Sequence, residues 1–143
     1  TVDLEGLILD ELDAAFPEYA QKTRLSGPRT RVSSSLSRDL SLAVHELAIN
    51  AFEHGAFSNV DGLTEIFWEV NLDQDGKRHL TLLWTEKEVR LVQVAGLRVG
   101  FGMEFLEKGF CRRTGAGVDL SVKRGGLTYR TELPLDQNAE PLA

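Results

Sequence analysis

The chain has 143 residues, 42% of them hydrophobic, and a formal net charge of −6. A chain of this length folds as one domain without crosslinks, and its single cysteine, Cys111, excludes an internal disulfide. The acidic balance and the lack of basic or long apolar runs argue against nucleic acid and direct membrane contact, and predict a cytoplasmic protein. We expect one domain over residues 1–135 and a polar C-terminal tail over 136–143.

Two amphipathic helices are predicted in the first half of the chain. The first follows a candidate N-cap at Asp3 and ends before Pro17. Its apolar positions recur at helical spacing and are Leu4, Leu7, Ile8, Leu12, Ala15 and Phe16. After a short strand over 21–25, a longer helix is predicted over 36–54, with a serine cluster to cap its start. Gly55 is expected to end it in a left-handed conformation.

The second half of the chain predicts two β-hairpins. Residues alternate in polarity over 64–72 and 79–85 around an Asp-Gly turn, and again over 117–123 and 127–135 around a Gly-Gly turn. Between the hairpins lies an irregular segment, 86–100, followed by a short helix. Helices and antiparallel hairpins in separate blocks predict an α+β fold, a two-layer α/β sandwich with a mixed, mainly antiparallel sheet and helices on one face.

A polar stripe runs along the predicted 36–54 helix, opposite its apolar face. Glu46, Asn50, Glu53 and His54 are spaced i, i+4, i+7 and i+8, so they share one side of the helix. A carboxylate and a carboxamide one turn apart can offer oxygen ligands to a hard cation such as Mg²⁺. On these residues alone, charges that simply face water are the more common explanation of such a stripe.

A motif changes this interpretation. The sequence HELAINAFEHGA at 45–56 resembles the N box of the GHKL ATPase superfamily, and in particular the HELxxNAxxxGA form of HWE-type sensor histidine kinases. That family is named for a histidine in this box and a later Trp-x-Glu, and Trp84-Thr85-Glu86 stands where the resemblance puts it. Gly100-Phe101-Gly102 is the third motif in order. The resemblance implies a Bergerat-type ATP-binding sandwich, with residues 87–99 as a lid over the nucleotide.

Glu86 stands out without the resemblance as well. It shares one face of its predicted strand with Leu80, Leu82 and Trp84, so the carboxylate continues an apolar row and needs a hydrogen-bond donor. By resemblance, this acid accepts the exocyclic amine of adenine. The alternatives are a strand-end glutamate in solvent and a tryptophan that serves only the core.

The resemblance implies roles for the other motif residues. Asn50 would ligate Mg²⁺ bridging the ATP phosphates, and Glu46 would polarise the attacking nucleophile or orient a metal-bound water. The residues predicted to contact the nucleotide are His45, Glu53, His54, Gly55, Trp84, Glu86, Gly100, Phe101 and Gly102. For His45, about 100° around the helix from Glu46, a packed or hydrogen-bonded structural histidine is at least as good an interpretation as nucleotide contact.

Two departures from the family pattern leave alternatives open. The family usually has a lysine at the position of Glu53, and glycines and proline after Trp-x-Glu, where this chain has KEVRLV at 87–92. A degenerate, non-catalytic ATPase-fold interaction domain is therefore one alternative. An anti-sigma-factor-type serine kinase of the same superfamily is another, because its N box also fits residues 46–55.

The resemblance favours the catalytic domain of a two-component sensor histidine kinase. Such a domain transfers the γ-phosphoryl group of ATP to a histidine on an upstream helix of its parent, and a response-regulator receiver domain accepts it next. None of the three histidines here, His45, His54 and His79, stands in such a helix context. The sequence leaves the sensed signal, the receiving regulator and the oligomeric state of the parent, a homodimer included, open.

Overall fold

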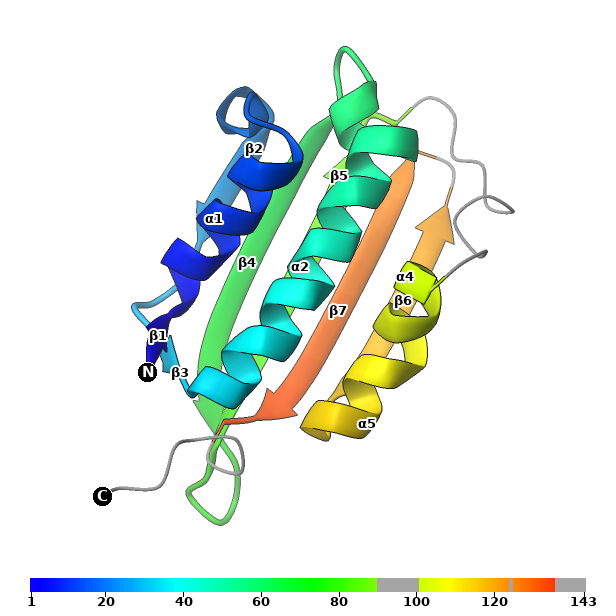
Figure 1. The fold of residues 1–143 in the computed structure, drawn as a ribbon. Coiled ribbons are helices and arrows are strands. Elements are labelled where there is room, and N and C mark those ends of the chain that lie inside the picture. Colours follow the sequence, from blue (N-terminus) through cyan, green and yellow to red (C-terminus); the bar gives the residue numbers. More distant parts are fainter. Residues whose placement is uncertain (90–100, 124, 136–143) are drawn as a thin grey trace.

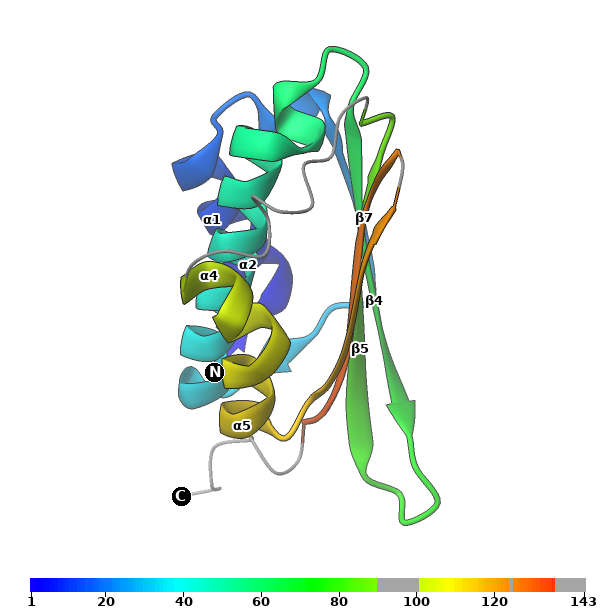
Figure 2. The same cartoon turned by 90° about the vertical axis from the view of Figure 1, so that its right-hand side faces the viewer.

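The computed structural model of the protein describes residues 1–89, 101–123 and 125–135. It has two layers, a five-stranded sheet and a layer of helices (Figure 1). In the described chain, the helices cover one face of the sheet and leave the other open, as the side view shows (Figure 2). The predicted α+β class and the two-layer sandwich with helices on one face are confirmed.

The sheet is mixed and mainly antiparallel. Its strand order is β2–β4–β5–β7–β6, in which only β2 and β4 run parallel. The strands are β2 (Thr23–Ser26), β4 (Leu63–Leu72), β5 (Arg78–Lys87), β6 (Gly117–Lys123) and β7 (Gly126–Pro134). Both predicted hairpins are present. A small pair, β1 (Val2–Asp3) with β3 (Arg31–Val32), was not predicted, because two residues are too few to show a period.

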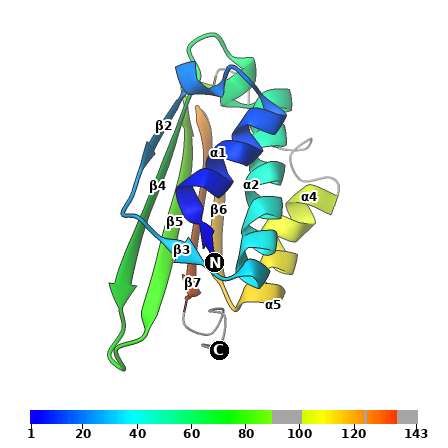
Figure 3. The same ribbon diagram turned by 60° about the vertical axis from the view of Figure 1, so that its left-hand side comes forward.

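Two long helices, α1 (Leu4–Ala15) and α2 (Ser34–His54), lie side by side over the sheet (Figure 3). Both begin at predicted caps. The Asp3 side chain accepts from the Gly6 N–H at 3.1 Å, and Ser33 Oγ accepts from the Leu36 N–H at 3.1 Å. None of the described helices is long and apolar enough to span a bilayer. The buried face of α2 is made of Leu36, Asp39, Leu40, Ala43, Val44, Leu47, Ala48 and Ala51.

The end of α2 differs from the prediction. Gly55 ends the helix and donates its N–H to Ala51 O at 3.1 Å, but its φ is −125°, so the predicted left-handed conformation is wrong. A Cβ atom on Gly55 would overlap Glu86 Oε1. Glycine is needed here because a side chain of β5 approaches the helix end closely, and the 3₁₀ turn η2 (Ala56–Ser58) follows directly.

The third helical segment has three parts. A single turn, α4 (Phe101–Glu104), continues into a π-helix, η3 (Phe105–Gly109), and then into α5 (Phe110–Thr114). The short helix after Gly100-Phe101-Gly102 was predicted, but its π-helical middle was not. Arg113 Nε lies 2.5 Å from Asp39 Oδ1, and this ion pair ties α5 to the first half of α2. A further 3₁₀ turn, η1 (Tyr19–Gln21), follows α1.

Strand β5 leaves the sheet through a residue with a left-handed backbone. Glu88 has φ 58°, and among the described residues it is the only non-glycine residue with a positive φ. The family pattern has glycines after Trp-x-Glu, and here a glutamate adopts a backbone conformation that glycine adopts without strain.

We expect Glu88→Gly to raise the free energy of unfolding by up to about 1 kcal/mol, because it removes this strain at a smaller entropic cost. Glu69→Gly, at an exposed position of β4, is the matched control and should lower it by about 1 kcal/mol. Denaturant unfolding of both variants measures the difference. Equal destabilisation by the two glycines would contradict the prediction.

Candidate functional site

The polar stripe of α2 faces the start of α4. Asn50 Nδ2 donates a hydrogen bond to Met103 Sδ at 2.9 Å. A Cβ atom on Gly102 would overlap Glu46 Oε2, so glycine is what lets this turn of helix approach the carboxylate. The structure therefore brings Glu46 and Asn50, from the first motif, together with Gly102, from the third.

The contact with Met103 fixes the direction of the Asn50 amide. A thioether sulfur only accepts hydrogen bonds, so the NH₂ group must face Met103 and the carbonyl oxygen Oδ1 must face away from it. Oδ1 is the atom that can ligate a cation. Sequence reasoning missed this role of Met103, because no local pattern reports a contact between distant segments.

Glu86 lies in a buried cluster at the C-terminal end of α2. Its exposed fraction is 4%, which excludes a strand-end glutamate in solvent. Oε1 accepts a hydrogen bond from the Ala56 N–H at 2.9 Å, and Oε2 accepts one from Trp84 Nε1 at 2.9 Å. Trp84 is itself 1% exposed, so it is both a core residue and a donor to the carboxylate.

Burial raises the pKa of the Glu86 carboxyl, and the hydrogen bonds from Ala56 and Trp84 oppose part of that shift. Because the pKa in the folded state lies above the unfolded value, this group favours folding more as the pH falls through the raised pKa. A carboxylate has about four acceptor positions, and these two donors fill two of them. Glu86 can therefore accept a further hydrogen bond from a ligand.

The remaining predicted site residues are more scattered. His45 Nδ1 lies 3.5 Å from Glu11 Oε2 of α1, so it faces the neighbouring helix and is not brought together with Glu46 and Asn50. His54 Nε2 lies 3.7 Å from Glu53 Oε2 at the end of the stripe, and the Glu53 side chain is 56% exposed. Phe101 begins α4. Gly100 and positions 90–99 of the predicted lid lie outside the described residues.

The oxygen atoms of the stripe suit a magnesium ion that takes its remaining ligands from waters and phosphate oxygens. Within the described residues, no group of three or more His, Cys, Asp or Glu side chains could hold a metal ion. Magnesium in phosphoryl-transfer sites typically has one or two protein oxygen ligands, with waters and phosphate oxygens for the rest. The oriented Oδ1 of Asn50, one helical turn from the Glu46 carboxylate, fits that pattern.

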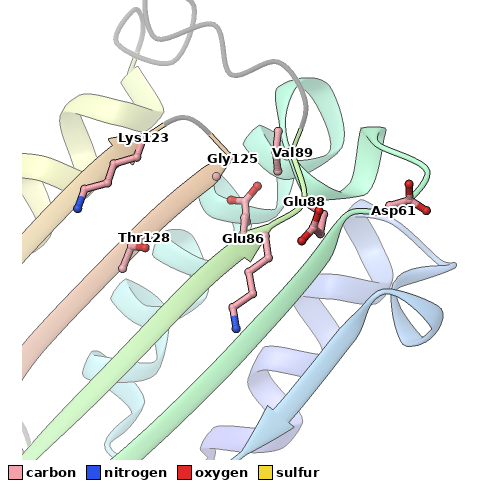
Figure 4. A pocket seen from close by; sticks show the side chains of 9 residues that line it. Asp61, Glu86, Glu88, Val89, Lys123, Gly125 and Thr128 are labelled. Carbon is pink, nitrogen blue, oxygen red and sulfur yellow. The ribbon is translucent and has the colours of Figure 1, made fainter.

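A cavity of about 590 Å³ opens beside the end of β5 (Figure 4). Glu88 and Asp61 lie on one side of it and Lys123 on the other, with Thr128 and Gly125 from the second hairpin. Of the predicted site residues that the structure describes, Glu86 alone lines it. The cavity is thus separate from the stripe that carries Glu46 and Asn50.

The chain is similar to known histidine kinases in sequence and in fold. The chain is 31% identical over 123 residues to a blue-light-activated histidine kinase of Brucella anthropi, which covers 86% of this chain and 25% of that protein. The solved histidine kinase domain of a blue-light-activated histidine kinase from Erythrobacter litoralis matches with a TM-score of 0.71 at 14% identity, over 96% of this chain and 67% of that one. No family model matches the chain.

A second solved structure contains a histidine kinase catalytic domain alone. The catalytic domain of histidine kinase ThkA matches with a TM-score of 0.64 at 15% identity, over 94% of both chains. This chain has the fold of a histidine kinase catalytic domain. The resemblance to histidine kinases is thereby confirmed in fold and in sequence. The chain spans only about a quarter of the length of the curated relatives that it matches.

The approach of Glu86 to Gly55 gives a stability prediction. Gly55→Ala should lower the free energy of unfolding by about 2–3 kcal/mol, because the new Cβ overlaps Glu86 Oε1 and pushes the buried carboxylate off its donors. Gly117→Ala, where a Cβ meets no atom, is the control and should change it little. Denaturant titration followed by tryptophan fluorescence measures both, and similar values for the two would contradict the proposed crowding.

Proposed function

We propose that this chain is the ATP-binding catalytic domain of a sensor histidine kinase. The observation that carries the proposal is the arrangement of polar groups on α2. Glu46 and Asn50 meet Gly102 and Met103 near its middle, and the buried Glu86 meets its end. Similarity to histidine kinases in sequence and in fold supports the same conclusion.

The adenine base would bind at the Glu86 end of the site. The carboxylate keeps acceptor capacity beyond its bonds to Ala56 and Trp84, and an exocyclic amine is a donor of the right kind. Trp84 holds the carboxylate in place through its indole N–H. A buried acceptor that is aimed by two fixed donors discriminates against a base that lacks the amine, since the lost bond would leave it poorly satisfied.

The phosphates would lie along the middle of α2, where the Asn50 oxygen and the Glu46 carboxylate stand. The residues present fit Mg²⁺, and Asn50 would hold it. When bound, such an ion neutralises phosphate charge. The contact with Met103 keeps the Asn50 oxygen turned toward the site.

Phosphoryl transfer would break the bond between the γ-phosphorus and the bridging oxygen of ATP and form a bond from phosphorus to an imidazole nitrogen. Glu46 would polarise the attacking histidine and take the proton that it loses. The acceptor helix belongs to the parent kinase, and a response-regulator receiver domain is the next acceptor. We propose a cytoplasmic location for these steps, since ATP and receiver domains are found there, and leave the oligomeric state of the parent to experiment.

Asn50→Ala should weaken binding of a non-hydrolysable ATP analogue with Mg²⁺ by more than about tenfold, because it removes an oxygen ligand from a charged site. Asn71→Ala is the matched control, since its side chain hydrogen-bonds to Glu69 far out on the first hairpin. Isothermal titration calorimetry of the three proteins measures the difference. If the unaltered domain does not bind the ATP analogue at millimolar concentration, the proposal is wrong.

The chemistry of the product separates the histidine kinase from its alternatives. Incubation of the domain with γ-labelled ATP and a histidine-bearing helix from a related kinase should yield a label that acid removes, as expected for phosphohistidine. An acid-stable label on a candidate partner would favour the serine kinase. Nucleotide binding without transfer to any acceptor would favour the non-catalytic interaction domain, which the exposed negative charge of Glu53 also suits.

A further inference from the structure

Tyr129 on β7 contacts the helical segment that completes the stripe. Its ring is 1% exposed, and its hydroxyl donates to Leu106 O at 2.8 Å. Leu106 lies inside the π-helix η3, directly after α4. Burial raises the pKa of Tyr129 far above its usual value, so the hydroxyl keeps the proton that it donates. The sheet thus contacts η3 through a neutral, buried hydrogen bond.

The segment needs such support. The turn α4 has only four residues, too few to be stable alone, and the π-helix after it is a rare and less favourable geometry. At its far end, α5 is held by the Arg113–Asp39 ion pair. Gly102 and Met103, which contact the stripe, are in α4. They are closer along the chain to Leu106, the partner of Tyr129, than to Arg113.

The register of the sheet places this bond beside the one that holds the base-binding carboxylate. Tyr129 of β7 is the direct partner of Trp84 of β5. Trp84 donates to Glu86, at one end of the site, and Tyr129 donates to Leu106, behind the other end. Two adjacent aromatic side chains in the centre of the sheet therefore each hold one end of the site.

We propose that Tyr129 is a positioning residue for the phosphate end of the site and that it acts through its hydroxyl. It fixes η3, which sets α4 against α2 and so keeps Met103 on the Asn50 amide. Loss of the hydroxyl leaves the Asn50 oxygen free to turn away. The consequence for ATP rests on the function proposed above, whereas the effect on the Met103 contact does not.

The only methionine of the chain is Met103, so labelling with ¹³C-methyl methionine gives a single signal from the contact itself. Asn50→Ala shows how this signal moves when the contact is lost. Tyr129→Phe should move it in the same direction. It should also weaken binding of the Mg²⁺-ATP analogue by roughly threefold to tenfold while leaving adenosine binding unchanged, because only the phosphate end is displaced.

Thr131→Val is the matched control. Thr131 lies two residues further along β7, is 1% exposed, and donates its hydroxyl to Gly117 O of β6 at 2.9 Å, so its bond is to a strand and not to η3. This variant loses a hydrogen bond of similar length from a buried side chain to a backbone carbonyl, and it should leave the Met103 signal and both affinities unchanged. An unmoved Met103 signal in Tyr129→Phe, or an equal shift in Thr131→Val, would overturn the proposal.

If Tyr129→Phe does not fold, a measurement that leaves Tyr129 in place still tests the proposal. The chain has two tyrosines, so 3-fluorotyrosine labelling of a Tyr19→Phe protein reports on Tyr129 alone. Its ¹⁹F signal should shift with the Mg²⁺-ATP analogue and not with adenosine. An unchanged signal at saturating analogue contradicts the coupling. Failure of the unaltered domain to bind nucleotide would instead count against the proposed function, and the Met103 signal would still decide the role of Tyr129.

Discussion

The buried carboxylate of Glu86 is the constraint on which the rest of the site depends. A charged group at 4% exposure is costly unless donors surround it, and the two donors here come from a neighbour on its own strand and from the backbone just past α2. Satisfying Glu86 therefore requires the end of α2 to lie directly on the end of β5. That requirement fixes the rotation of α2 about its axis, and with it the direction of Glu46 and Asn50.

Once α2 is fixed, its two faces have different partners. The apolar face packs on the sheet, and the stripe packs against α4, which comes from a segment far along the chain. Gly55 and Gly102 make both approaches possible, since a Cβ at either position would overlap a carboxylate oxygen. Both glycines thus allow the backbone to approach a glutamate closely, although Gly55 ends α2 and Gly102 lies in the first turn of α4.

Much of this arrangement could be predicted from local pattern. Apolar spacing and the caps Asp3 and Ser33 place α1 and α2 within a few residues, and strict alternation places both hairpins. The sequence also shows that Glu86 points inward. It does not show which donors meet it, nor the π-helix, nor the pairing of His45 with Glu11, because these depend on contacts between distant segments. For the same reason a left-handed Gly55 was the natural prediction from a helix end alone.

The charge of the domain separates the two ends of the site chemically. The stripe presents Glu46 and Glu53, and the chain as a whole carries a net charge of −6, so triphosphate oxygens would be repelled there without a cation. In the function proposed above, the Glu86 end would meet a neutral base through a hydrogen bond, and that contact would need no cation. Base recognition and phosphate binding would then differ in their need for a cation. Base recognition at the end of α2 would not require a metal ion, and phosphate binding near Glu46 and Asn50 would. Because α2 carries the stripe and ends beside Glu86 of β5, a nucleotide whose base binds at Glu86 would have its phosphates directed along the stripe toward Asn50.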